Sequence, residues 1–307
     1  MSVDLKVLEA IKTNFLAIFT QALGEKANTI TELNKIMTVL PVDKANKVVL
    51  SWFGVVPPME EWKDERKMSK LPPYEYTIDI KDWANGLELL RTDIDDDKLG
   101  QYPARIAAMA TAYYKLLRKT FFGLLNGGAT TYKAYDGGYM FANTRTIGKS
   151  SNIDNLIAGT YHDTEAHIRD ALAAAVTAMG AFEDDWGDPL GLVPDTIVCS
   201  PDMMIPITTA LWLPGVAGTE RPEKAYVENI IQDPNITSGS AKDWFVLCTK
   251  EAIKPLIMGD RKKPEFTSLD LPTSPAAFSS KKFLYGADAR FGYGFGDPRT
   301  AIMIDSA

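Results

Sequence analysis

A strict alternation of apolar and polar residues in "YEYTIDIKDW" (74–83) is the feature that most constrains the fold. Tyr74, Tyr76, Ile78 and Ile80 occupy every second position, and charged or polar residues lie between them. A period of two residues is typical of a β-strand with one buried face. The earlier run "KVVLSWF" (47–53) is β-branched and aromatic, which also favours a strand. Together the two runs predict a long β-hairpin.

The connection between these strands, residues 57–73, holds four prolines and the mixed-charge run "EEWKDERK". Long irregular connections of this kind are usually functional or disordered. The hairpin also carries Trp52, Phe53, Trp62 and Trp83. Each such ring has roughly 150–250 Å² of surface to bury. We therefore expect something outside the chain's own core to cover this projection.

Helical spacing of apolar residues predicts helices over 1–24, 30–37, 103–126 and 164–180. Pro103 suits the start of the long third helix, and Gly127 its end. Asp163 or Thr164 caps the fourth. Strands are predicted at 195–200, 243–249, 254–259 and 301–306, a helix-like segment at 201–212, and one or two more strands within 281–300. The pattern is that of an α+β fold.

Composition excludes several classes of protein. The chain has 307 residues and a net charge of −7, so its overall charge does not suit wrapping of nucleic acid. Its two cysteines, Cys199 and Cys248, lie in apolar runs and are expected to be buried and unpaired, as in a reducing compartment. The amphipathic N-terminus lacks the features of a signal peptide, and no membrane span is expected.

No metal site or cofactor site is expected. The two histidines, His162 and His167, match no zinc motif and are interpreted as solvated residues at a helix start. The acidic run that begins at Asp93 has Lys98 where a calcium loop needs glycine, and Ala104 where it needs glutamate, so it is interpreted as an acidic turn.

Catalytic motifs are missing as well. No GxSxG elbow occurs, and the glycines of "NGGATT" and "GYGFG" do not have phosphate-loop spacing, so we assign them to turns and strand bends. The carboxylates Asp184, Asp185 and Asp188 are interpreted as a solvated turn. An enzyme is therefore not expected. A soluble hydrolase or binding protein whose site has no sequence motif stays open as an alternative.

Three segments resemble, in the same order, the Mu-like phage major head subunit family, which has the Hong Kong 97-type capsid fold. They are "SWFGVVPPMEEWKDERKM" (51–68), "YEYTIDIKDWANGLELLRTDIDDDKLGQY" (74–102) and "GLLNGG…YDGGYMFA" (123–142). The positions that carry the second motif are Tyr76, Ile78, Lys81, Arg91, Asp93, Asp96, Asp97, Leu99, Gly100 and Tyr102. The C-terminal half is similar only to the general pattern of the fold.

The resemblance implies a shell protein whose hexamers and pentamers form an icosahedral head around double-stranded DNA, without sequence-specific binding. It implies four parts: an N-terminal arm (1–46), an extended loop (47–92), a peripheral domain (93–159 and 241–307) with a long spine helix, and an axial domain (160–240). An encapsulin-like compartment that holds cargo enzymes is the alternative with the same fold.

By the same resemblance, a neighbouring subunit receives the hairpin. The residues expected at this contact are Trp52, Phe53, Glu60, Glu61, Trp62, Lys63, Asp64, Glu65, Arg66, Lys67, Tyr74, Tyr76 and Ile78. The long helix begins too early for an N-terminal scaffolding domain, so a separate scaffolding protein is expected, together with a portal and with or without a decoration protein. No lysine–asparagine cross-linking pair is identified. The expected location is the virion, assembled in the host bacterial cytoplasm.

Overall fold

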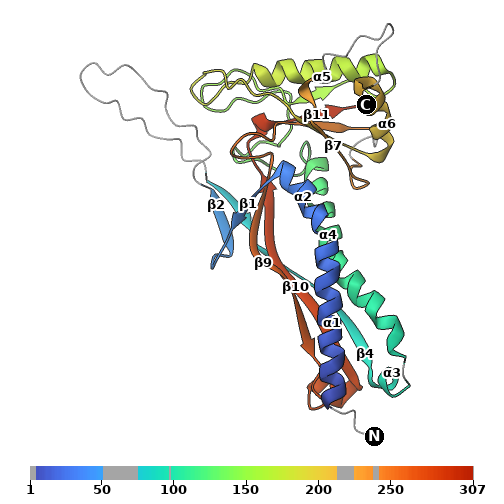
Figure 1. Ribbon diagram of the computed structural model, residues 1–307. Helices are drawn as coiled ribbons and strands as arrows, with labels where there is room; N and C mark the ends of the chain where they lie inside the picture. The colour runs from blue at the N-terminus through green and yellow to red at the C-terminus, as the bar shows by residue number, and fades with distance from the viewer. Residues whose placement is uncertain (1–4, 51–74, 97, 213–224, 238–241, 307) are drawn as a thin grey trace, which may run out of the picture.

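A computed structural model describes residues 5–50, 75–96, 98–212, 225–237 and 242–306. The molecule is elongated, with a long sheet and two long helices along its axis and a second sheet at one end (Figure 1). Both sheets draw strands from distant parts of the chain, which confirms the predicted α+β class.

The long sheet has the strand order β1-β9-β10-β4. Its centre is the antiparallel pair β9 (Leu256–Leu269) and β10 (Lys282–Phe295). β4 (Lys81–Leu90) pairs antiparallel with β10 at one edge, and β1 (Met37–Pro41) pairs parallel with β9 at the other. The sequence did not predict β1, and it predicted only the first residues of β9.

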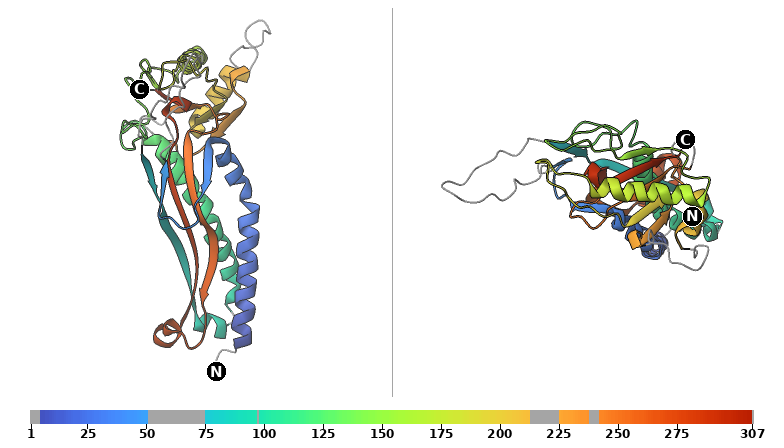
Figure 2. Two further views of the ribbon diagram at one scale, coloured as in Figure 1. Left: turned by 90° about the vertical axis from the view of Figure 1, so that its left-hand side faces the viewer. Right: turned by 90° about the horizontal axis from the view of Figure 1, so that it is seen from above.

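Two helices run along one face of this sheet, α1 (Leu5–Glu25) and α4 (Tyr102–Asn126) (Figure 2). At 1.5 Å per residue, α4 is about 37 Å long. The helices pack on alternate residues of β10, such as Phe283 and Tyr285, through Phe15 of α1 and Ile106 of α4. The predicted apolar stripe of the long helix is therefore confirmed. The short helices α2 (Ala27–Ile36) and α3 (Arg91–Asp95) complete this part.

The second sheet has the order β5-β11-β8-β6-β7. Its strands are β5 (Leu156–Ala158), β11 (Ala301–Asp305), β8 (Trp244–Leu247), β6 (Thr196–Cys199) and β7 (Asn229–Gln232). Helices α5 (Glu165–Gly180) and α6 (Pro201–Trp212) cover one face, and the end of α4 lies toward the other. Thr164 caps α5, as predicted.

This sheet crosses the predicted boundary between residues 240 and 241. β6 lies before the boundary and β8 after it, yet they are hydrogen-bonded neighbours in register Thr196↔Leu247 to Cys199↔Trp244. Strands of one sheet form one packed unit. The five-stranded sheet therefore joins residues that were assigned to the axial domain with residues that were assigned to the peripheral domain.

Asp184 and Asp185 are buried, which corrects their interpretation as a solvated turn. Asp185 pairs with the guanidinium of Arg299 at 3.0 Å, and Arg299 is itself fully buried. Asp184 accepts the backbone N–H groups of Trp186 and Asp188. The sequence could not show this because the partner of Asp185 lies 114 positions away.

The remaining elements are short: α7 (Pro275–Ser280) and the 3₁₀ turns at Leu99–Gln101 and Pro298–Thr300. Cys199 and Cys248 are buried and free, as predicted. Among the described residues, no helix is both long and apolar enough to cross a membrane.

Candidate assembly element at the root of the hairpin

The base of the predicted hairpin is present. β2 (Lys47–Leu50) pairs antiparallel with β3 (Tyr76–Asp79), in register from Lys47↔Asp79 to Leu50↔Tyr76. Because Leu50 and Tyr76 face each other, the chain leaves and returns at one point. These two strands are called the root of the hairpin below.

The root is held against the long sheet by three glycines that allow close approach. A Cβ on Gly292 would lie 2.6 Å from the Asp79 carbonyl oxygen, and one on Gly294 would lie 2.8 Å from Ile78. A Cβ on Gly259 would lie 2.8 Å from Val48. Gly292 and Gly294 belong to "GYGFG", whose glycines were assigned to turns and strand bends, and neither of the two lies in a turn. They lie within β10 and leave room for a strand that crosses it.

Side chains of the root contact other segments of the same chain. Ile78 is 2 % exposed and packs into the core beside Leu50. The Tyr76 hydroxyl accepts the backbone N–H of Phe295 at 3.1 Å, and burial raises the pKa of Tyr76. Ile78 therefore anchors the hairpin instead of offering surface to a neighbour, which corrects the expectation for this residue.

The other expected contact residues are Trp52, Phe53, Glu60, Glu61, Trp62, Lys63, Asp64, Glu65, Arg66, Lys67 and Tyr74. They lie outside the described residues, and their role stays a prediction. Trp83, which was expected on the projection, instead lies in β4, where its ring stacks on Phe291 with the ring centroids 5.2 Å apart.

A polar cleft of about 200 Å³ lies beside the root, between β3, β10 and the loop after α4. Lys81 and Lys133 line it. The Lys81 ammonium lies 4.8 Å from the Tyr293 ring centroid and donates to the Tyr293 hydroxyl at 3.1 Å. Lys81 belongs to the family motif, whereas nothing in the sequence pointed to Lys133 or Tyr293.

The face of the long sheet away from the helices carries ion pairs across its strands. Lys262 pairs with Asp288 at 2.5 Å, Lys282 pairs with Glu88 at 2.5 Å, and Arg290 pairs with Asp82. In each pair, the two opposite charges lie on neighbouring strands of the same chain. These charges are therefore paired within the chain.

Groups suited to hold a metal ion do not occur among the residues that the structure describes. His167 lies in the first turn of α5, where its backbone N–H donates to the Thr164 hydroxyl and its Nδ1 lies 2.6 Å from Asp163. The residues of the candidate element thus hold strands in place, and their chemistry is that of packing and ion pairing.

The profile of one protein family matches most of the chain. This family is described as the Mu-like prophage major head subunit gpT, and the match covers residues 8–168 and 218–305. The chain belongs to this family. The resemblance found in the motifs of residues 51–142 is thereby confirmed.

Individual relatives agree. This chain is 24% identical to the Mu-like prophage FluMu major head subunit of Haemophilus influenzae over 290 residues. The aligned region covers 94% of this chain and 70% of the relative. The chain is 22% identical over 300 residues to the major capsid protein of Escherichia phage Mu, covering 97% and 74%. The procapsid of bacteriophage JBD30 has a similar fold, with a TM-score of 0.59, 22% identity and coverage of 98% and 75%.

These findings establish a major capsid protein of a tailed phage or prophage, with the Hong Kong 97-type fold and a place in the virion. They also confirm that the chain is not an enzyme, because the family consists of structural head proteins. No finding favours the encapsulin-like alternative.

Proposed function

We propose that the head protein assembles into hexamers and pentamers of an icosahedral shell, and that the hairpin is the element that joins adjacent subunits. The observation that carries this proposal is the close packing of the root. β2 and β3 are packed on the long sheet at backbone distance through Gly292 and Gly294. A root packed in this way gives each subunit the same attachment point for the hairpin, which a repeated head-to-tail contact in a closed ring requires.

The division into four parts is also a proposal, and the sheets refine it. The peripheral part would be the long sheet with α4, and the N-terminal arm of 1–46 would lie along it through α1. The axial part would be the five-stranded sheet with α5 and α6, which includes β8 and β11. The extended loop would begin at Lys47 and end at Asp79, because β4 is a strand of the long sheet.

The partners of this chain are part of the same proposal. A separate scaffolding protein, a portal and, in some heads, a decoration protein would act with this chain in the host bacterial cytoplasm. The shell would enclose double-stranded DNA without reading its sequence. A net charge of −7 supports this, since an acidic container does not bind DNA tightly.

Replacement of residues 57–73 by a short linker tests the role of the hairpin. The two strands of the root remain, so the variant should fold, but it should not form closed shells under electron microscopy and light scattering. A second variant, in which 57–73 become a glycine–serine segment of equal length, separates loss of side chains from loss of reach. Shells at wild-type yield from both variants would contradict the proposal.

A further inference from the structure

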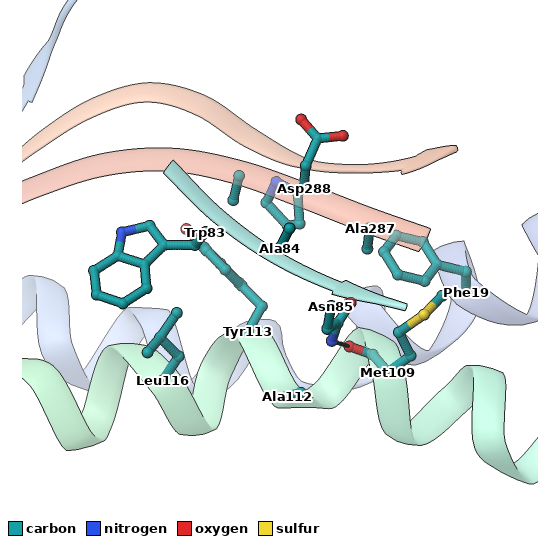
Figure 3. A pocket seen from close by; sticks show the side chains of 12 residues that line it. Phe19, Trp83, Ala84, Asn85, Met109, Ala112, Tyr113, Leu116, Ala287 and Asp288 are labelled. Carbon is teal, nitrogen blue, oxygen red and sulfur yellow. Dashed lines mark hydrogen bonds between the residues drawn. The ribbon is translucent and has the colours of Figure 1, made fainter. Parts of the chain in front are cut away.

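Two clefts of the molecule differ in how they could select a ligand. The cleft of about 250 Å³ between α4 and β4 is lined mostly by apolar side chains, with Trp83 at one end (Figure 3). The charged residue of its lining, Asp288, is paired with Lys262 at 2.5 Å. Charge therefore selects no ligand in that cleft. The polar cleft of about 200 Å³ beside the root of the hairpin has a different lining.

The lining of the polar cleft includes the side chains of Lys81 and Lys133. Neither lysine forms an ion pair with a carboxylate of the described residues, in contrast to Lys262 in the long sheet. The acidic residue of the lining, Asp79, already has a partner, since Lys47 lies 3.5 Å from it. The cleft therefore carries an excess of positive charge that the described part of the chain does not offset.

Neutral hydrogen-bond donors lie beside these ammonium groups. The Tyr293 hydroxyl accepts a bond from Lys81 at 3.1 Å, so its own proton is available to an acceptor. The strand β3 has one unpaired edge, because its sheet has only two strands. Ile80 donates its backbone N–H to the residue before β2, so the strand alternation directs the N–H groups of Thr77 and Asp79 to the unpaired edge. Both residues line the cleft.

We propose that this cleft binds a small oxyanion of the phosphate class between Lys81 and Lys133. A phosphate group carries a charge of about −1.5 to −2 at pH 7 and has several strong acceptor oxygens, which matches two ammonium groups and the donors around them. A carboxylate has a single charge and fewer acceptor atoms. The net charge of −7 disfavours the backbone of DNA as the source of the phosphate.

The position of the two lysines gives the anion a structural role. Lys81 begins β4 directly beside the root, and Lys133 lies in the loop that follows α4. An anion held by both would join the root to the end of the long helix. The site lies within one chain, so it does not depend on the assembly of subunits.

Thermal unfolding of the unassembled full chain in inorganic phosphate tests the site. At equal ionic strength and pH 7.5, phosphate should raise the unfolding midpoint by about 1–3 °C more than chloride does. Exclusion of phosphate from the protein surface adds a rise that is common to every variant. Lys133→Ala should lose the specific rise, whereas Lys119→Ala, which removes an exposed lysine of α4 outside the cleft, should keep it. The same rise in both variants overturns the proposal.

Calorimetric titration with phosphate measures binding without unfolding. Lys133→Ala and Tyr293→Phe should each weaken the affinity about fivefold or more, and Tyr293→Phe keeps the ring beside the Lys81 ammonium. Phosphate should also slow hydrogen exchange in residues 76–81 and 129–133 of the wild type, and not in Lys133→Ala. The absence of saturable binding, or protection confined to other segments, would refute the site.

Acetate and a short duplex DNA of mixed sequence distinguish the other sources of an anion. Acetate should bind at least about tenfold more weakly than phosphate because it carries one charge. The duplex should not compete with phosphate for the cleft. Competition by the duplex would assign the cleft to a DNA backbone, and equal affinity for acetate would assign it to a carboxylate. Either result overturns the proposal, and neither bears on shell assembly.

Discussion

Gly292 of β10 lies in contact with the main chain of Asp79 in β3, so that a Cβ at position 292 would be 2.6 Å from the Asp79 carbonyl oxygen. The root of the hairpin is therefore stacked on the long sheet at backbone distance. The long sheet therefore fixes the position of the root.

Gly292→Ala should separate the root from the sheet. The carbonyl of Asp79 cannot move without disturbing its strand, so we expect a loss of about 1–3 kcal/mol in the free energy of unfolding, together with fewer shells. Urea unfolding followed by circular dichroism measures it. Gly123→Ala is the control, because nothing lies within 4 Å of its Cβ position and the helix should gain about 0.5–1 kcal/mol. Equal stability of Gly292→Ala and the wild type would show that the root is not tightly packed.

Arg299→Leu should destabilise the fold strongly. The guanidinium is fully buried and contacts Asp297 at 2.7 Å, Asp185 at 3.0 Å and the Tyr135 hydroxyl at 3.1 Å. Removal leaves the buried carboxylate of Asp185 and the partly buried one of Asp297 without their cation, which costs about 3–5 kcal/mol.

Chemical denaturation at pH 7 measures this loss. Lys250→Ala is its control, since the pair with Glu228 is exposed to solvent and should contribute little to stability. A loss in Arg299→Leu no larger than in the control would refute the importance of the buried network.

Asp260→Asn should change stability with pH. Burial raises the pKa of Asp260 above that of an ordinary aspartate, and its Oδ1 is buried without a hydrogen-bond partner in the described part of the chain. A raised folded-state pKa means that the carboxyl group favours folding at low pH, and that this contribution is lost as pH rises through the folded-state pKa. The variant should therefore exceed the wild type at pH 7 by less than about 1 kcal/mol, since the group is partly exposed, and the gain should vanish near pH 3.

Urea titrations at the two pH values test this, with Asp43→Asn as a reference for removal of an exposed charge. A gain for Asp260→Asn that is as large at pH 3 as at pH 7 would contradict the assigned protonation.

The two cysteines should resist alkylation in the folded chain. Burial raises the pKa of Cys199 to about 12, and Cys248 is only 2 % exposed. The thiolate is the reactive form, so iodoacetamide at pH 8 should modify neither residue until urea unfolds the chain. Mass spectrometry counts the adducts, and rapid labelling of the folded protein would show that these sites open.

Sequence patterns predicted the local elements well. The apolar stripe of 103–126 and the cap at Thr164 depend on residues a few positions apart, and both are present in α4 and α5. The alternation at Tyr76 and Ile78 correctly predicted a strand with one buried face. The motifs of residues 51–142 also identified the family, because several segments resemble that family in the same order along the chain.

The sequence by itself thus determined the α+β class, the long helix, the hairpin strands and the family of head proteins. Only the tertiary structure decided that β4 belongs to the long sheet, that Gly292 and Gly294 lie beneath the hairpin root, and that Asp185 is buried against Arg299. Each of these depends on residues that are 100 to more than 200 positions apart, such as Asp79 and Gly292. Local propensity and periodicity carry no information on such pairs, because their contact exists only after the distant segments have packed together.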